Sequence, residues 1–162
     1  MQVNSFNEMY ISEFQEARSF EAQLIRALPD MIDKAGDPDL KQALKTHQSE
    51  TRGHLEHVTE ILRRHEASLE EHKDHSMERL LSEADKWADM IEDRDQRDAG
   101  IVASAQRIEH YEMAVYGTLA AWAKQLGLGE DEKDLRAILT EEQAADKKLT
   151  MLAEKEINPS AT

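Results

Sequence analysis

Four long stretches of the chain repeat apolar residues at steps of three and four, which is the spacing of one face of an α-helix. These repeats predict helices at about residues 5–35, 39–65, 99–126 and 131–156. The apolar positions are Phe14, Ala17, Leu24, Leu28 and Met31; Leu40, Ala43, Val58 and Ile61; Ile101, Ala105, Ile108, Val115, Leu119, Trp122 and Leu126; and Leu135, Ile138, Ala145, Leu149 and Leu152.

Turn signals separate the first predicted helix from the second and the third from the fourth. Asp37 is placed to cap the second helix, and Pro38 suits its first position because proline lacks the N–H that would be free there. Gly127 or Gly129 is placed to take the left-handed conformation that ends the third helix. Each short turn predicts two antiparallel helices that lie next to each other.

The connection between the second and third helices, residues 66–97, is much longer. It holds a shorter amphipathic pattern, formed by Leu80, Leu81, Ala84, Trp87, Ala88 and Ile91. Bundles with one long crossover include the ferritin-like folds. The sequence therefore predicts an all-α, ferritin-like four-helix bundle with a helix in the crossover, as a single domain over residues 1–157, followed by a short polar tail at 158–162.

Each long helix places one glutamate within its apolar face: Glu21, Glu50, Glu112 and Glu142. Counted from the two turns, the four lie at the same depth to within about one residue, or about 1.5 Å of helix rise. One such glutamate is usually a boundary residue that reaches solvent. Four converging carboxylates in a core would protonate or bind cations, because a lone buried charge is costly. We therefore expect a site for two divalent metal ions.

Further residues have two readings. His54 and Asp146, four residues after Glu50 and Glu142, are candidate ligands; Asp146 equally suits a surface salt bridge with Lys147 or Arg136. Glu109 is either a further ligand or a flanking residue. His47 is one turn off in depth, so a core or supporting position suits it better. Tyr116 is placed either to hydrogen-bond a ligand carboxylate or only to pack.

Composition narrows the classes of function. The 162 residues carry 34 acidic and 20 basic side chains, a formal charge of −14 that disfavours nucleic acids and anionic membranes as partners. The absence of cysteine excludes disulfides and thiolate chemistry. No secretory signal or membrane-spanning run is visible, so a cytoplasmic location is expected. Phosphate-binding loops, dinucleotide fingerprints and Ser-His-Asp patterns are also missing.

The sequence resembles the YciE/YciF family of ferritin-like proteins over nearly its whole length. The similar segments are Leu28-Pro29, residues 47–51 (HQSET), residues 53–56 (GHLE), residues 109–112 (EHYE) with 116–119 (YGTL), and Glu141-Glu142 with Asp146, Leu149 and Thr150. The resemblance implies a bacterial stress-response protein, a homodimer, and a di-metal centre at Glu21, Glu50, Glu112 and Glu142. It supplies no defined reaction.

One departure from broader ferritin-like proteins stands out, because those carry histidine three residues after glutamate on two helices. Here these positions are Gly53 and Ala145, and we expect His54 and Asp146 to substitute. An oxygen-rich set of this kind favours iron or manganese. The expected function is handling of peroxide, oxygen or iron at two metal ions per chain, which leaves oxidoreductase activity open; the alternative is an interaction protein with a structural or vestigial metal site.

Overall fold

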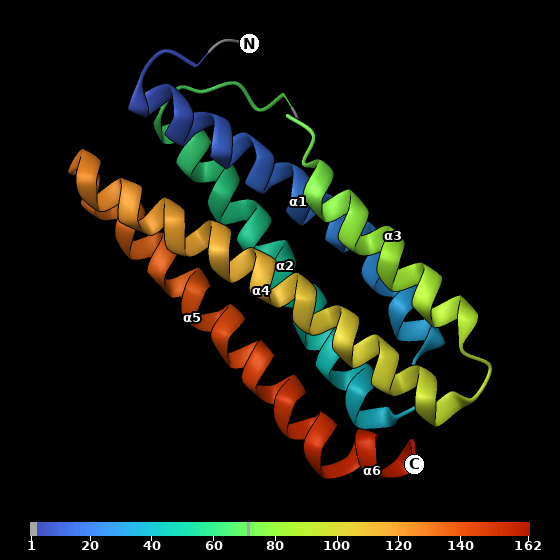
Figure 1. Cartoon of the computed structure of the whole chain (residues 1–162). Helices are drawn as coiled ribbons and strands as arrows, with labels where there is room; N and C mark the ends of the chain where they lie inside the picture. Colours follow the sequence, from blue (N-terminus) through green and yellow to red (C-terminus); the bar gives the residue numbers. More distant parts are fainter. Residues whose placement is uncertain (1–2, 71) are drawn as a thin grey trace.

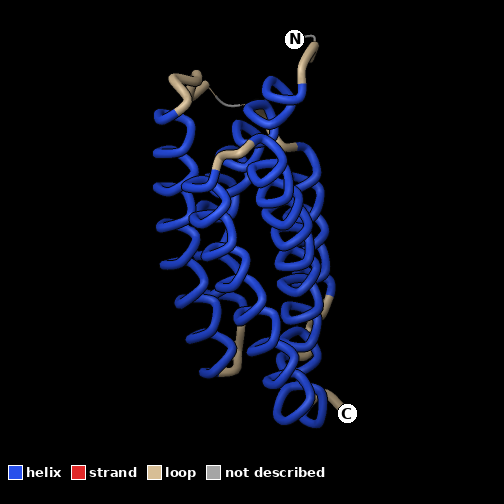
Figure 2. Tube along the Cα trace, turned by 90° about the vertical axis from the view of Figure 1, so that its left-hand side faces the viewer, coloured by secondary structure: helices blue, strands red, loops and turns tan. Residues whose placement is uncertain are grey.

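The computed structural model describes residues 3–70 and 72–162, and within these ranges all regular secondary structure is helical (Figures 1 and 2). Residues 1, 2 and 71, which fall in the predicted domain and crossover, lie outside the described residues. The elements are α1 (Phe6–Lys34), α2 (Pro38–Arg64), α3 (His75–Met90), α4 (Arg94–Leu126), α5 (Gly129–Leu152), the π-helical turn η1 (Ala153–Ile157) and α6 (Asn158–Ser160).

The four long helices α1, α2, α4 and α5 pack along one another, and α3 lies against α1 and α4 (Figure 1). α1 and α2 are antiparallel neighbours, as are α4 and α5. α3 lies beside α1 and runs in the same direction, so α4 starts beside the turn between α1 and α2 (Figure 1). Asp98 fixes this arrangement, since its carboxylate accepts hydrogen bonds from the backbone N–H groups of Gly36 (2.6 Å) and Asp37 (2.7 Å).

The turn signals predicted at Asp37 and Gly127 act as expected, and Ser5 provides a further cap that was not predicted. Ser5 caps α1 by accepting from the Glu8 N–H, and Asp37 caps α2 by accepting from the N–H groups of the second and third helical residues. Gly127 ends α4 in the left-handed conformation, with φ of 73°. The helix boundaries there agree with the prediction to within about two residues.

Two boundaries differ from the prediction. α4 begins at Arg94 rather than near residue 99, because Asp93 caps it by accepting from the Gln96 N–H at 2.9 Å. At the C-terminal end of the chain, α5 continues through η1 into α6. Residues 158–160, which were expected to belong to a polar tail, therefore form a helical turn. Ile157, the last residue of η1, is buried and anchors this extension to the core.

The core lies between the long helices and consists largely of the predicted apolar positions. Phe14, Leu24, Leu40, Leu119 and Leu135 are fully buried. Trp122, Leu126 and Leu152 are only partly buried but pack against the same core. Every helix in the described ranges is too short or too polar to span a lipid bilayer.

Candidate metal centre

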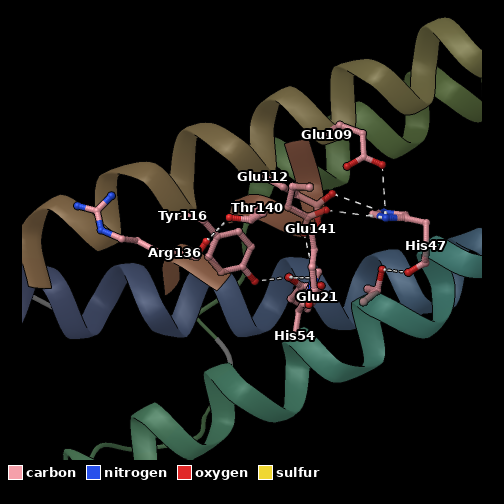
Figure 3. A network of polar contacts seen from close by, with 11 residues as sticks. Glu21, His47, His54, Glu109, Glu112, Tyr116, Arg136, Thr140 and Glu141 are labelled. Atoms are coloured by element: carbon pink, nitrogen blue, oxygen red, sulfur yellow. Dashed lines mark hydrogen bonds and ion pairs between the residues drawn. The ribbon is translucent and has the colours of Figure 1, made fainter. Parts of the chain in front are cut away.

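Six ionisable side chains meet in the interior at the middle of the long helices (Figure 3). They form two groups, and within each group one potential ligand atom per residue lies within 4.8 Å of all the others. The first group contains His47, Glu109, Glu112 and Glu142, and the second contains Glu21, His54 and Glu142. Glu142 belongs to both, so its carboxylate lies between the two positions.

The first group surrounds the ring of His47. Its Nδ1 lies 3.4 Å from Glu109 Oε1 and 3.9 Å from Glu142 Oε2, and its Nε2 lies 3.6 Å from Glu112 Oε2. These separations are longer than hydrogen bonds, and neither ring nitrogen has a hydrogen-bond partner. Three carboxylates thus surround an imidazole that forms no hydrogen bond with any of them.

The second group is built around His54. Its Nδ1 lies 3.0 Å from Glu142 Oε1 and 3.8 Å from Glu21 Oε1, without the alignment of a hydrogen bond. Its Nε2 is 2.8 Å from Glu141 Oε2, a partly exposed carboxylate. If Nε2–H donates to Glu141, the Nδ1 lone pair points at the cluster, which is the tautomer that binds a metal.

Tyr116 contacts Glu21, the other carboxylate of the second group. Its hydroxyl donates a hydrogen bond to Glu21 Oε1, and both side chains are fully buried (Figure 3). Tyr116 therefore hydrogen-bonds one of the predicted ligand carboxylates rather than only packing. The bond leaves the second oxygen of Glu21, Oε2, without a partner.

The described residues contain twelve buried side-chain nitrogen and oxygen atoms that make no hydrogen bond, and nine of them belong to these six residues. Buried polar atoms are nearly always hydrogen-bonded, and leaving one without a partner costs about 1–3 kcal/mol. Such a concentration at one place indicates ligand atoms directed at a cation. The donor set is four carboxylates and two imidazoles, which fits first-row divalent metals.

The pKa values reflect this crowding. Burial, and then the charge of Glu142, raise the pKa of Glu109 to about 10; burial and Glu142 also raise the pKa of Glu21 to about 8, against the opposing effects of His54 and Tyr116. Burial followed by neighbouring carboxylates raises the pKa of Glu112 well above its ordinary value. Without a cation, protons would therefore balance much of the negative charge.

The two histidines shift in opposite directions. Burial lowers the pKa of His47. Burial also acts to lower the pKa of His54, but its contacts with Glu142, Glu21 and Glu141 outweigh this and raise it to about 9. The pKa of Glu142 is lowered overall, since His54 more than offsets burial. His54 and Glu142 thus form the charged pair of the metal-free cluster.

The structure brings together five of the seven predicted ligands: Glu21, His54, Glu109, Glu112 and Glu142. Glu50 is only partly buried and lies outside both groups. Asp146 is also outside, where it accepts from Gln106 Nε2 at 3.0 Å and lies 3.3 Å from His110 Nε2. Their ligation stays a prediction, and both lie at the edge of the cluster.

His47 takes the place that the sequence analysis gave to Glu50. Successive helical residues are rotated by about 100°, so positions 47 and 54 differ by only about 20°, whereas position 50 is turned by about 40–60° from both. The inward line of α2 therefore passes through the two histidines. Their spacing of seven residues was the sequence signal that could have identified His47.

A pocket of about 190 Å³ connects this cluster with the surface between α2 and α5. His47 and Glu109 line its inner part, and Thr46, Glu50 and Lys148 line it nearer the solvent. The remaining lining residues are apolar: Ala43, Leu44, Ala144, Ala145 and Leu149. The first group is thus accessible from one side through side chains that are mostly small.

Comparison with known proteins identifies close relatives. Residues 5–162 match the family described as a domain of unknown function, DUF892. The protein YciF of Escherichia coli strain K12 is 36% identical over 162 residues, covering 99% of this chain and 98% of that protein.

Solved structures agree with this match. The crystal structure of the E. coli stress protein YciF has a TM-score of 0.92 at 36% identity, covering 96% of this chain and 99% of the other. YcfI from Rhodopseudomonas palustris, described with a proposed structural role, has a TM-score of 0.89 at 35% identity, with coverage of 92% and 95%. A Xanthomonas campestris protein at 20% identity has a TM-score of 0.75, over 93% of this chain and 92% of that one, which shows the fold alone.

Proposed function

Because the chain belongs to the DUF892 family and is a YciF-like protein, we propose that it is a ferritin-like stress-response protein with a carboxylate-bridged di-metal centre. The metals are iron or manganese, and the reaction handles peroxide, oxygen or iron. The stress role comes from the relative that is called a stress protein. The proposal of a metal centre rests on the buried carboxylates and imidazoles of this chain.

One observation carries the proposal: nine of the hydrogen-bonding atoms of six residues are buried together without partners. A cluster with a purely structural role would be expected to satisfy its own hydrogen bonds, as the buried Asp131 does with Tyr10, Arg64 and His65. Two bound cations would give these unpartnered atoms ligand bonds and so remove the cost of burying them. As in ferritin-like bundles, facing helices present carboxylates and imidazoles to the interior, although here α2 contributes two histidines and neither group contains a Glu-x-x-His pair.

The residues divide between two ions. His47, Glu109 and Glu112 would hold one, Glu21 and His54 would hold the other, and Glu142 would bridge them. Tyr116 and Glu141 would orient Glu21 and His54 through their hydrogen bonds. When bound, such ions supply Lewis acidity and, for iron or manganese, electron transfer.

The rest of the chain controls access and protons. On the side of Leu24, Leu28 and Ile108 the cluster borders a cavity of only about 10 Å³, so the pocket of about 190 Å³ between α2 and α5 is the larger opening to it. The buried Glu109 lines that pocket, and its pKa is raised to about 10, so its carboxyl holds a proton at neutral pH in the metal-free protein. That proton would leave when a cation binds.

Metal content tests the proposal directly. The protein would be purified without added metal, loaded anaerobically with Fe²⁺ or Mn²⁺, freed of excess ion and analysed by elemental mass spectrometry. We expect about two ions per chain, as in di-metal bundles, and loss of metal in Glu112→Ala. Glu154→Gln, at an exposed position of η1, is the matched control and should keep both ions. Absence of bound metal after loading would overturn the proposal.

The second candidate function is an interaction protein in which the metal serves only the fold. The relative from R. palustris with a proposed structural role favours it. The pocket that reaches His47 and Glu109 favours the first candidate, since a purely structural metal site is closed to solvent. Turnover of hydrogen peroxide or oxygen by the loaded protein, lost in Glu112→Ala, would separate the two.

We further propose that the protein acts as a homodimer in the cytoplasm. Trp87 and Met90, near the end of α3, are 43% and 66% exposed, which is unusual for large apolar side chains. Burial of these side chains against a second copy would explain them. Sedimentation analysis should give twice the 18.5 kDa chain mass, and Trp87→Glu should shift the protein towards the monomer.

A further inference from the structure

The pocket between α2 and α5 has a charged mouth and a floor of proposed ligands. Glu50 and Lys148 line the outer part, and His47 and Glu109 line the inner part. His47 is 6% exposed, and both of its ring nitrogens lack hydrogen-bond partners. An unpartnered, buried imidazole at the end of an open pocket is a ready ligand for a cation that arrives from solvent.

The size of the pocket suits a hydrated ion. The pocket has about 190 Å³, below the usual 300–1,000 Å³ of sites for larger organic ligands. Ala144 and Ala145 border it on the α5 side, so no long side chain from these positions obstructs the route.

Glu50 is the carboxylate of this pocket that is neither fully buried nor fully exposed. Burial and the charges of Glu141 and Glu142 raise the pKa of Glu50, whereas His54 and Lys148 lower it. Glu50 and Lys148 both line the pocket, so the carboxylate and the ammonium group lie along the same route. A carboxylate at such a position attracts a divalent ion and can then release it to His47 and Glu109 in the inner part of the pocket. Lys148 opposes this step by repelling the ion and by attracting the same carboxylate.

We propose that this pocket is the route by which a hydrated divalent cation reaches the buried centre, with Glu50 as its first, transient ligand. This inference rests on the proposed di-metal function. On this proposal Glu50, which lies outside both groups, speeds the entry of the cation, whereas Lys148 slows it. Equilibrium metal content and the rate of metal uptake should therefore respond to different residues.

The test is stopped-flow mixing of metal-free protein with Mn²⁺ and a metal-indicator dye, followed by metal analysis at equilibrium. Glu50→Gln should bind Mn²⁺ about tenfold more slowly, since a charged cleft raises association rates by about 10-fold or more. Lys148→Gln should bind it faster, and both effects should shrink at high ionic strength. Ala145→Leu, which narrows the pocket, should be slow at any ionic strength. Ala137→Leu, exposed on α5 away from the pocket, is the control and should match the unsubstituted protein.

The outcomes separate this inference from the proposed function. Slower uptake with unchanged final stoichiometry supports the route. Unchanged rates in both Glu50→Gln and Ala145→Leu, with full final occupancy, overturn it and leave the di-metal centre intact. Loss of one ion at equilibrium in Glu50→Gln overturns it differently, because Glu50 would then be a permanent ligand. If the unsubstituted protein takes up no Mn²⁺ or Fe²⁺, the proposed function itself fails.

Discussion

His47 and His54 lie two turns apart on the same face of α2, and different oxygens of one carboxylate face their rings. Glu142 Oε1 lies 3.0 Å from His54 Nδ1, and Glu142 Oε2 lies 3.9 Å from His47 Nδ1. Seven residues of helix rise by about 10 Å, which is too far for the two rings to share one ion. The carboxylate that lies between them is therefore the natural bridge between two metal positions.

Glu142→Gln should consequently remove both ions, whereas Glu21→Gln should remove only one. Glu21 belongs to the second group alone, so the first group keeps His47, Glu109, Glu112 and Glu142 in that variant. Elemental analysis after loading and desalting should give about zero and about one ion per chain, against about two in the unsubstituted protein. Equal losses in the two variants would contradict the bridging assignment.

Glu112→Leu should stabilise the metal-free protein. The Glu112 side chain is fully buried and neither of its oxygens has a hydrogen-bond partner. Replacing it with an apolar side chain of similar size removes that cost, a gain of about 1–3 kcal/mol in the free energy of unfolding. Urea denaturation in the presence of a chelator measures the change.

The same variant should lose the stabilisation that added Mn²⁺ gives to the unsubstituted protein. Glu154→Gln, on the exposed side of η1, is the comparison, because it changes a carboxylate without touching the cluster. A metal-free Glu112→Leu protein that is less stable than the unsubstituted one would show that Glu112 already has a stabilising partner.

Glu141→Gln tests whether a partly exposed residue orients a metal ligand. The Glu141 side chain is 52% exposed, so its removal should cost little stability, yet it contacts His54 Nε2 at 2.8 Å. Loss of such an outer partner typically lowers metal affinity 10- to 100-fold. Chelator competition should show this weakening for one of two ions, with full occupancy restored at high metal concentration. An affinity equal to that of Glu154→Gln would assign Glu141 to the solvated surface.

The fold could be predicted from the sequence largely because its signals are local. The apolar faces, the Asp37 cap and the Gly127 stop each act within one or two helical turns. The start of α4 was predicted about five residues late, since the charged segment before Gly100 gave no periodic signal. The buried position of Asp98 there depends on backbone N–H groups of the distant α1–α2 turn.

Five of the seven predicted ligands meet in the two groups, whereas Glu50 on α2 and Asp146 on α5 lie outside them and His47 on α2 lies within. The depth of a residue along a helix follows from its distance in sequence from the turn, so counting residues correctly placed Glu21, Glu112 and Glu142 at one level. Rotation about α2 is set by its packing against neighbouring helices. Because His47, Glu50 and His54 are within about 60° of one another, the sequence alone could not decide which two point inward.

The pH dependence of stability should reverse when metal is bound. In the metal-free protein the pKa values of Glu21 and Glu109 are raised to about 8 and about 10, so the folded state holds protons that the unfolded chain releases above about 4.5. Their contribution is complete below that ordinary value and is lost as pH rises through the folded values. His54 acts in the same direction, since its raised pKa of about 9 gives stability below 6.5 that is lost as pH approaches 9.

The opposing groups act at lower pH. The lowered pKa of His47 reduces stability only below its ordinary value of 6.5, and the lowered pKa of Glu142 matters only below about 4.5. Between pH 6.5 and 9 these cluster residues therefore predict that the metal-free protein loses stability, whereas bound Mn²⁺ stabilises it increasingly, because protons no longer compete for the ligands. Thermal melts across this range, with chelator and with Mn²⁺, measure both trends. A constant difference between the two melting temperatures would show that the ion does not replace protons on these carboxylates.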